Sequence, residues 1–203
     1  MTDFSAVKEL LKQGIIETLD GLRKDHPNET FYAFALYDAD GDAIDSSANS
    51  EEKFQKQIER AGCANSDERF LYRWGTAEWA YEATDHTEKF GEANALLSEA
   101  DRDDWYEFQA KSFGASIFAL KELADVGLFG TGKNRMVAFF SLSDDEYAPW
   151  LEIESARRIN PPDVFQTFES EWKICTQQTW GEDIDLTGGE LAQAFQKVHG
   201  TAW

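Results

Sequence analysis

Apolar residues recur at helical spacing along the first part of the chain. Between residues 3 and 24 they fall three or four positions apart, which places them on one face of a helix. They are Phe4, Val7, Leu11, Ile15, Leu19 and Leu22. The segment His26-Pro27-Asn28 interrupts this pattern. The sequence therefore predicts an amphipathic helix over residues 3–24.

A strand-like pattern follows the first helix. Residues 31–37 read FYAFALY, and the acidic segment DADGD at residues 38–42 ends the run. An Asp-Gly pair between two extended segments favours a hairpin, because a primed turn requires positive φ. We expect the second strand over residues 43–47. Asn49 and Glu52 have the spacing of a capping box and predict a helix to about Arg60.

Further elements alternate along the rest of the chain. Residues 70–74 (FLYRW) resemble a third strand, and a helical stretch runs from about residue 86 to 100. The clearest helix spans residues 102–126, and MVAFFSL at 136–142 is the best single strand. On one face of that helix lie Trp105, Phe108, Ala115, Ala119, Leu123 and Val126.

The C-terminal third is predicted to be helical. Helical signals surround residues 152–159, and Pro162 suits the first turn of a helix over residues 163–172. Thr187 and Glu190 form a capping box for a last helix to about Val198. Strands and helices do not alternate strictly. We therefore predict an α+β fold with a partly antiparallel sheet of about four to six strands, packed with several helices in one domain over residues 1–203.

Charge is the most unusual feature of the composition. The chain has 39 Asp and Glu residues against 19 Lys and Arg, which gives a formal net charge of −20. Aromatic residues make up 14% of the chain, enough for a substantial core. An acidic surface is repelled by nucleic acid and anionic membranes and attracts basic proteins. The alternative, that acidity only aids solubility, remains open at this point.

The sequence indicates a cytoplasmic protein. Its N-terminus lacks a secretion signal, and no run approaches the length of about 18 apolar residues that a membrane span needs. Cys63 and Cys175 are the two cysteines, and neither belongs to a CxxC pair. Nothing in the pattern indicates an oligomeric state.

Two segments resemble known ligand-binding loops, but each fails on position. The segment Gly127–Asn134 has the G-x4-G-K spacing of a phosphate-binding loop, yet a helix precedes it and a strand follows, the reverse of the required order. We expect it to connect that helix to that strand. In a calcium loop starting at Asp38, Ala43 and Asn49 stand where Gly and Glu are required.

The three histidines are far apart in the sequence and lack the spacing of metal ligands. We therefore predict no metal and no cofactor.

The densest aromatic segment, RWGTAEWAYE at residues 73–82, contains Glu78 and Glu82. Four residues apart on a helix, the two carboxylates could act as a catalytic pair, although such spacing is frequent by chance in so acidic a chain. Trp74 and Trp79 in the same segment are candidates for the core or for an interface. The cysteines and serines lack the flanking motifs of catalytic nucleophiles.

Several segments together carry a family resemblance. FYAFALYDADGD, YRWGTAEWAYE, RMVAFFSLSDDE and SARRINPPDVFQTF occur in this order. The chain from its first helix to about Phe168 resembles the bacterial domain-of-unknown-function family numbered 4303. The plainest matches are Trp74, Glu78, Trp79, Asn160 and Pro161, whereas Gly75-Thr76 replaces an expected Ser-Pro. The resemblance implies a bacterial cytoplasmic protein, and such families often accompany toxin systems as immunity proteins.

These observations favour a non-enzymatic protein-binding module, such as an immunity protein that neutralises a basic toxin. The expected contacts are acidic residues of the hairpin and of the segment after the last strand. They are Asp38, Asp40, Asp42, Asp45, Asp144, Asp145 and Glu146. The alternative is a small-molecule enzyme that uses carboxylates near Glu78 and Glu82.

Overall fold

A computed structural model describes residues 2–38, 43–132, 135–142, 146–181 and 184–200. In these ranges the chain forms helices and strands in the order α1 (Phe4–Asp25), β1 (Phe31–Asp38), β2 (Ile44–Ser50), α2 (Glu51–Ala61), α3 (Arg69–Trp74), the short 3-10 helix η1 (Thr76–Glu78), β3 (Tyr81–Glu82), α4 (Lys89–Ser98), α5 (Trp105–Asp125), β4 (Val137–Leu142), α6 (Ala148–Ile159), α7 (Pro162–Trp180) and α8 (Gly189–His199).

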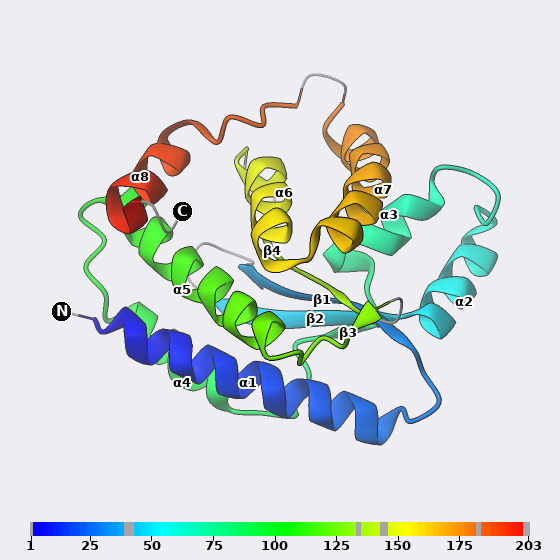
Figure 1. The fold of residues 1–203 in the computed structure, drawn as a ribbon, viewed down its shortest axis with the longest axis horizontal. Helices are drawn as coiled ribbons and strands as arrows, with labels where there is room; N and C mark the ends of the chain where they lie inside the picture. Colours follow the sequence, from blue (N-terminus) through cyan, green and yellow to red (C-terminus); the bar gives the residue numbers. More distant parts are fainter. Residues whose placement is uncertain (1, 39–42, 133–134, 143–145, 182–183, 201–203) are drawn as a thin grey trace.

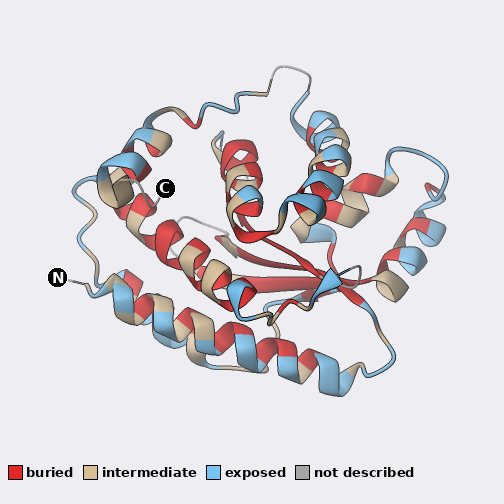
Figure 2. Cartoon of the chain, in the orientation of Figure 1, coloured by how far each residue is buried: buried red, intermediate tan, exposed pale blue. Residues whose placement is uncertain are grey.

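The fold is α+β, as predicted. The described strands form one sheet in the order β3-β2-β1-β4, in which β1 is antiparallel to β2 and parallel to β4. Helices cover both faces of this sheet (Figure 1). Helices α1, α4 and α5 lie on one side, with α8 against α5, and α3 and α7 lie on the other. The central strands are buried along their length, whereas α1 is buried on one face only (Figure 2).

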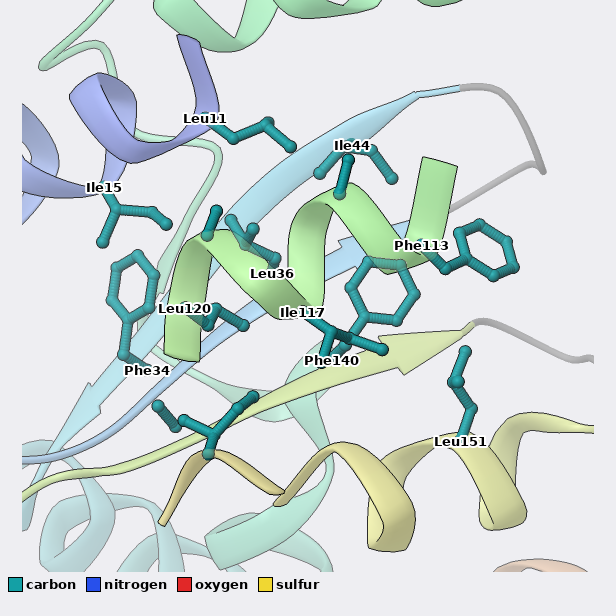
Figure 3. Packing of buried hydrophobic residues seen from close by; sticks show 14 of the residues in the cluster. Leu11, Ile15, Phe34, Leu36, Ile44, Phe113, Ile117, Leu120, Phe140 and Leu151 are labelled. Atoms are coloured by element: carbon teal, nitrogen blue, oxygen red, sulfur yellow. The ribbon is translucent and has the colours of Figure 1, made fainter. Parts of the chain in front are cut away.

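The larger core lies between the sheet and α1, α4 and α5. Phe34 and Leu36 of β1 and Phe140 of β4 project into it and meet Leu11 and Ile15 of α1 (Figure 3). The side chains of α5 fill the middle of this layer, and those of Phe113 and Phe140 lie with their ring centroids 5.0 Å apart. The apolar residues of α1 face this core, as the helical spacing in the sequence predicted.

A second core lies on the opposite face of the sheet. Neighbouring residues of a strand point to opposite faces, so Phe139 faces away from Phe140 and packs against Phe168 of α7, with 5.2 Å between the ring centroids. Trp74 and Trp79 join this core and are 4% and 5% exposed. Both tryptophans are therefore core residues.

Side-chain amides pair with the outer edges of the sheet. Asn160, which ends α6, accepts a hydrogen bond from the backbone N–H of Ala138 at 3.0 Å and donates one to its carbonyl at 2.7 Å. The Oγ of Ser155 lies 2.9 Å from the N–H of Phe140, from which it accepts a hydrogen bond. On β2, Asn94 of α4 forms the same two bonds with the backbone of Ile44. Edge groups that would lack a partner strand are thus satisfied.

The predicted strand over residues 70–74 is wrong, because these residues belong to helix α3. A short apolar run cannot be distinguished from a buried helical turn by its pattern alone. In the helix, Phe70 and Trp74 lie four residues apart and share the buried face. The Asp-Gly turn at residues 40–41 lies outside the described residues, but β1 and β2 pair antiparallel as a hairpin requires.

Two predicted caps are also wrong. Ser50, not Asn49, caps α2, because its side chain accepts a hydrogen bond from the N–H of Lys53. Gly188 precedes α8 in a left-handed conformation, where the capping box predicted Thr187. The apolar face predicted for α5 extends too far, since Trp105 and Val126 at its two ends are 39% and 78% exposed. Pro162 does begin α7, which continues to Trp180, beyond the predicted end at residue 172.

The glycine-rich segment after α5 connects this helix to β4, as predicted. Gly127 and Gly130 adopt φ values of 84° and 88°, which favour glycine because other residues are strained there. The N–H of Met136 donates to the carbonyl of Phe129 at 2.8 Å and aligns the chain with β4. Among the described helices, none has both the length and the apolar character needed to cross a bilayer.

Candidate functional site

Polar side chains line the sheet where β1 and β4 end. Tyr37 of β1 is in register with Ser141 of β4 on one side and with Asp45 of β2 on the other. Side chains of residues directly opposite each other project from the same face. Phe139 faces the core under α3 and α7, and Ser141, two residues later, projects from the same face. Tyr37, Asp45 and Ser141 therefore form a polar row at the end of the apolar second core.

Glu82 of β3 joins this row. It is in register with Ser47 and hydrogen-bonds through its carboxylate to the hydroxyl of Tyr37. Burial raises the pKa of Asp45, and the charge of Glu82 increases it further, although the N–H of Ser46 donates to the Asp45 carboxylate at 2.7 Å. Burial and these two carboxylates also raise the pKa of Tyr37. Among the described residues, no ion pair joins Asp45 or Glu82 to a basic side chain, so burial and like charge act on Asp45 without a compensating cation.

Glu152 of α6 is the third carboxyl group at this end of the sheet. One carboxyl oxygen accepts a hydrogen bond from Ser141 Oγ at 2.5 Å, and the other accepts one from Trp172 Nε1 at 2.8 Å. Part of the residue surface is still exposed, but the carboxyl group itself is surrounded by protein atoms. Burial raises the pKa of Glu152 to about 7, against the opposing effect of its two neutral donors. With a pKa of about 7, both the protonated and the ionised form of Glu152 are populated at neutral pH.

Glu152 borders a pocket of about 250 Å³ between η1, the end of β4 and α7. Thr76 of η1 closes one side, where its Oγ1 lies 3.3 Å from Ser141 Oγ and its carbonyl accepts a hydrogen bond from Ser47 at 3.3 Å. Trp74 and Trp180 also line the pocket. The pocket thus has one carboxyl group, several hydroxyl groups and two indole rings.

Cys175 lines the same pocket but is poorly suited to act as a nucleophile. Burial raises the pKa of its thiol to about 12, and the charge of Glu152 adds to the increase. A nucleophilic cysteine requires the thiolate, which is scarce at such a pKa. In the described part of the chain, no group of three or more His, Cys, Asp or Glu residues has an arrangement that could hold a metal ion.

A larger hollow of about 470 Å³ lies on the other side of Trp74. Its central cation, Arg73, forms ion pairs with Glu51 at 2.9 Å and with Glu171 at 3.1 Å. The guanidinium also lies over the ring of Tyr32, 4.3 Å from its centroid. Arg73 is thus paired within this hollow, whereas no ion pair of Glu152 with a basic side chain is found among the described residues, so the smaller pocket at Glu152 is the better candidate site.

The comparison with protein families agrees with the resemblance in the sequence. A family model described as a domain of unknown function, DUF4303, matches residues 11–161. The chain belongs to the DUF4303 family. Comparisons with curated proteins and with solved structures found no match. The matched range includes Asp45, Glu82 and Glu152 but ends before α7, which supplies Trp172 and Cys175.

Four of the residues that carried the DUF4303 resemblance have structural roles. Trp74 donates its indole N–H to Glu171 at 3.0 Å, and Trp79 donates to the carbonyl of Arg73 at 3.0 Å. Asn160 ends α6 while pairing with β4, and Pro161 starts the turn into α7. A residue before proline favours the extended conformation, which Asn160 adopts with ψ of 153°. The fifth residue, Glu78, is exposed at the end of η1.

The acidic residues expected to contact a partner differ in accessibility. Asp38 is only 2% exposed, so its side chain is not available on the surface. Asp45 is half-buried within the polar row, and Glu146 is exposed before α6. Asp40, Asp42, Asp144 and Asp145 lie outside the described residues. Of the predicted contacts, Asp45 therefore lies within the candidate site.

The structure separates the proposed catalytic pair. Glu78 belongs to η1 and Glu82 to β3, and both are exposed, so they do not share a helical face. Glu82 instead neighbours Asp45, which the sequence associated with a different function. The sequence did not indicate Glu152, because one glutamate in an amphipathic helix has no distinguishing pattern. Its importance comes from Ser141 and Trp172, residues 11 and 20 positions away.

Proposed function

We propose that this DUF4303 protein is a non-enzymatic binding module for a basic protein. The observation that carries the proposal is the set of Asp45, Glu82 and Glu152, three carboxyl groups at one end of the sheet whose described contacts include no basic side chain. Asp45 and Glu152 are partly buried, and such a carboxylate without a cation gains most when a partner supplies one, because part of its desolvation is already present in the free protein.

The overall charge would favour the same partner. A net charge of −20 attracts a basic protein at distances beyond direct contact and raises its association rate by about 10–10³-fold. This attraction weakens as salt concentration rises, since the screening length is about 8 Å at physiological ionic strength. The sheet end would then supply the specific contacts after the encounter.

The setting that we propose is the bacterial cytoplasm, with a toxin as the basic partner. Many enzymes that cleave nucleic acids bind phosphates through clusters of Arg and Lys. An acidic protein that covers such a cluster blocks access of the substrate without any chemical reaction. The proposed role is therefore that of an immunity protein that acts by occlusion.

The test begins with capture of partners at low ionic strength. The immobilised chain is exposed to a lysate of its native host, and each captured basic protein is purified and titrated against the chain by calorimetry. We expect a basic protein to bind with an affinity that falls steeply with salt. If the captured proteins contain no basic partner that binds in purified form, the proposal is wrong.

Variants then locate the contact surface. The triple variant Asp45→Asn, Glu82→Gln and Glu152→Gln removes the three ionisable carboxyl groups of the sheet end. A matched control, Asp20→Asn, Glu59→Gln and Glu99→Gln, removes three charges from exposed positions elsewhere. We expect at least a tenfold greater loss of affinity in the first variant, because the control changes only the long-range attraction. Equal losses would exclude the sheet end as the contact surface.

A second candidate function, a small-molecule enzyme, is favoured by one observation. Glu152 has its pKa raised to about 7 and borders a pocket, as the general acid or base of an enzyme does. A panel of ester, glycoside and phosphate substrates with chromogenic leaving groups tests this alternative. Turnover that disappears in Glu152→Gln but persists in Glu99→Gln would support it.

A further inference from the structure

The pocket at Glu152 has features that point to one chemical group of the partner. Both carboxyl oxygens are held by neutral donors, Ser141 Oγ and Trp172 Nε1. Each carboxylate oxygen can accept more than one hydrogen bond, so acceptor capacity remains unused. A group that fills the pocket and donates to these oxygens would strengthen the interaction most if it carried a positive charge.

The walls of the pocket also suit a cation. Trp74 and Trp180 contribute their indole rings, which attract cations more strongly than other aromatic rings do. Trp180 is 42% exposed and lies at the end of α7, so it is accessible to an entering side chain. Hydroxyl groups of Thr76, Thr176 and Thr179 supply further acceptors.

The acceptor groups and aromatic rings of the pocket favour a guanidinium group over an ammonium group. A guanidinium group is planar, stacks on aromatic rings and presents several N–H donors in one plane, whereas an ammonium group is a compact and strongly hydrated charge. A pocket of about 250 Å³ lined by one carboxyl group and two tryptophans suits the planar group.

We propose that this pocket receives one arginine side chain of the basic partner, whose guanidinium pairs with the Glu152 carboxylate beside Trp74 and Trp180. This inference rests on the proposed function and adds the residue type that the site recognises. The arginine would act as the anchor of the interface, since a buried charge pair surrounded by aromatic rings is typical of such anchors.

The isolated pocket can be tested with n-butylguanidinium chloride as the probe. Binding is followed by the ¹H–¹⁵N resonance of the Trp172 indole, whose N–H donates to Glu152. The neutral control is n-butylurea, which has nearly the same shape without the charge. We expect n-butylguanidinium to bind at least tenfold more tightly than n-butylurea. Equal binding of the two compounds, or binding of neither, would overturn the inference.

Glu152→Gln is the decisive variant. Its amide can accept from Trp172 and donate to Ser141, so both hydrogen bonds of the site survive. We expect the preference for n-butylguanidinium to disappear in this variant and to persist in the exposed control Glu99→Gln. A preference that persists in Glu152→Gln would show that another group holds the cation.

The affinity for the probe should depend on pH. Cys175 is the titratable group that faces Glu152 from α7, and its thiol stays neutral because burial raises its pKa to about 12. Thr76 from η1 and Ser141 from β4 do not titrate in this range. With the pKa of Glu152 near 7, the affinity should rise roughly tenfold between about pH 6 and pH 8. A constant affinity would contradict the assignment.

The two proposals can fail separately. If a purified basic partner binds wild-type chain and Glu152→Gln equally well, the arginine pocket is wrong, and the proposed function stands. If no basic partner is captured but n-butylguanidinium binds as expected, the pocket is a cation site and the proposed function is wrong. A loss of at least tenfold in partner affinity in Glu152→Gln, with no loss in Glu99→Gln, supports both.

Discussion

The Glu152→Gln variant tests the electrostatics of the buried carboxyl through protein stability. The pKa of Glu152 is raised from an ordinary value of 4.5 to about 7 in the folded protein. Between these two values the folded state binds more protons than the unfolded state, so the free energy of unfolding falls as pH rises. The stabilisation is complete below about pH 4.5 and is lost as pH rises through 7.

The size of the effect follows from the shift in pKa. A difference of about 2.5 pH units, from 4.5 to about 7, corresponds to about 3 kcal/mol in total. Between about pH 5 and pH 8, ionisation of Glu152 should lower the free energy of unfolding by about 2–3 kcal/mol. Glutamine keeps the hydrogen bonds to Ser141 and Trp172 but does not ionise. The stability of the variant should therefore rise relative to wild type by about 2–3 kcal/mol over this pH range.

Urea denaturation of wild type, Glu152→Gln and Glu99→Gln at several pH values measures this difference. The exposed Glu99 serves as the matched control, because it has the same substitution without burial. The expected result is a stability difference that grows with pH for Glu152→Gln and stays flat for Glu99→Gln. A pH-independent difference for Glu152→Gln would refute the claim that its carboxyl is buried without a cation.

Two further substitutions test packing and edge pairing. Asn160→Ala leaves the buried N–H and C=O of Ala138 without their partner. The free energy of unfolding, measured by urea denaturation, should fall by about 2–4 kcal/mol. A smaller loss than in an exposed Asn→Ala control would contradict this role of Asn160. Gly114→Ala places a Cβ 2.2 Å from His199 Nε2 and should lower the free energy of unfolding, measured by thermal denaturation, by about 1–3 kcal/mol. The loss should be smaller when His199→Ala is present in the same chain. Additive effects of these two changes would exclude the contact.

Periodic patterns in the sequence predicted much of the fold. The helix α1 was predicted correctly, because one of its faces is buried against the core. The strand at residues 136–142 was also predicted correctly, because β4 is buried along its whole length. Residues 70–74 were misassigned, because the six residues of helix α3 are too few for a periodic pattern and tertiary packing decides their conformation. The parallel pairing of β1 with β4 was also not predictable, since about a hundred residues separate the two strands.

The candidate site was less predictable than the fold. Asp45 and Glu82 were each singled out, but for different functions, and only the hairpin and β3 bring them together. Glu152 could not be found from the sequence. Its raised pKa depends on burial, and burial depends on the packing of α6 and α7 around the end of β4.

The amide pairs at the sheet edges restrict how any partner can bind. Many recognition domains extend their sheet by accepting an extended peptide along an open edge, where main-chain hydrogen bonds supply the affinity. Here Asn160 and Ser155 occupy the hydrogen-bonding groups of β4, and Asn94 occupies those of Ile44 in β2. A peptide could join β4 only after α6 moved away. These edge positions on β4 and β2 therefore also resist pairing between copies of the chain, and recognition there must come from side chains that project from the surface.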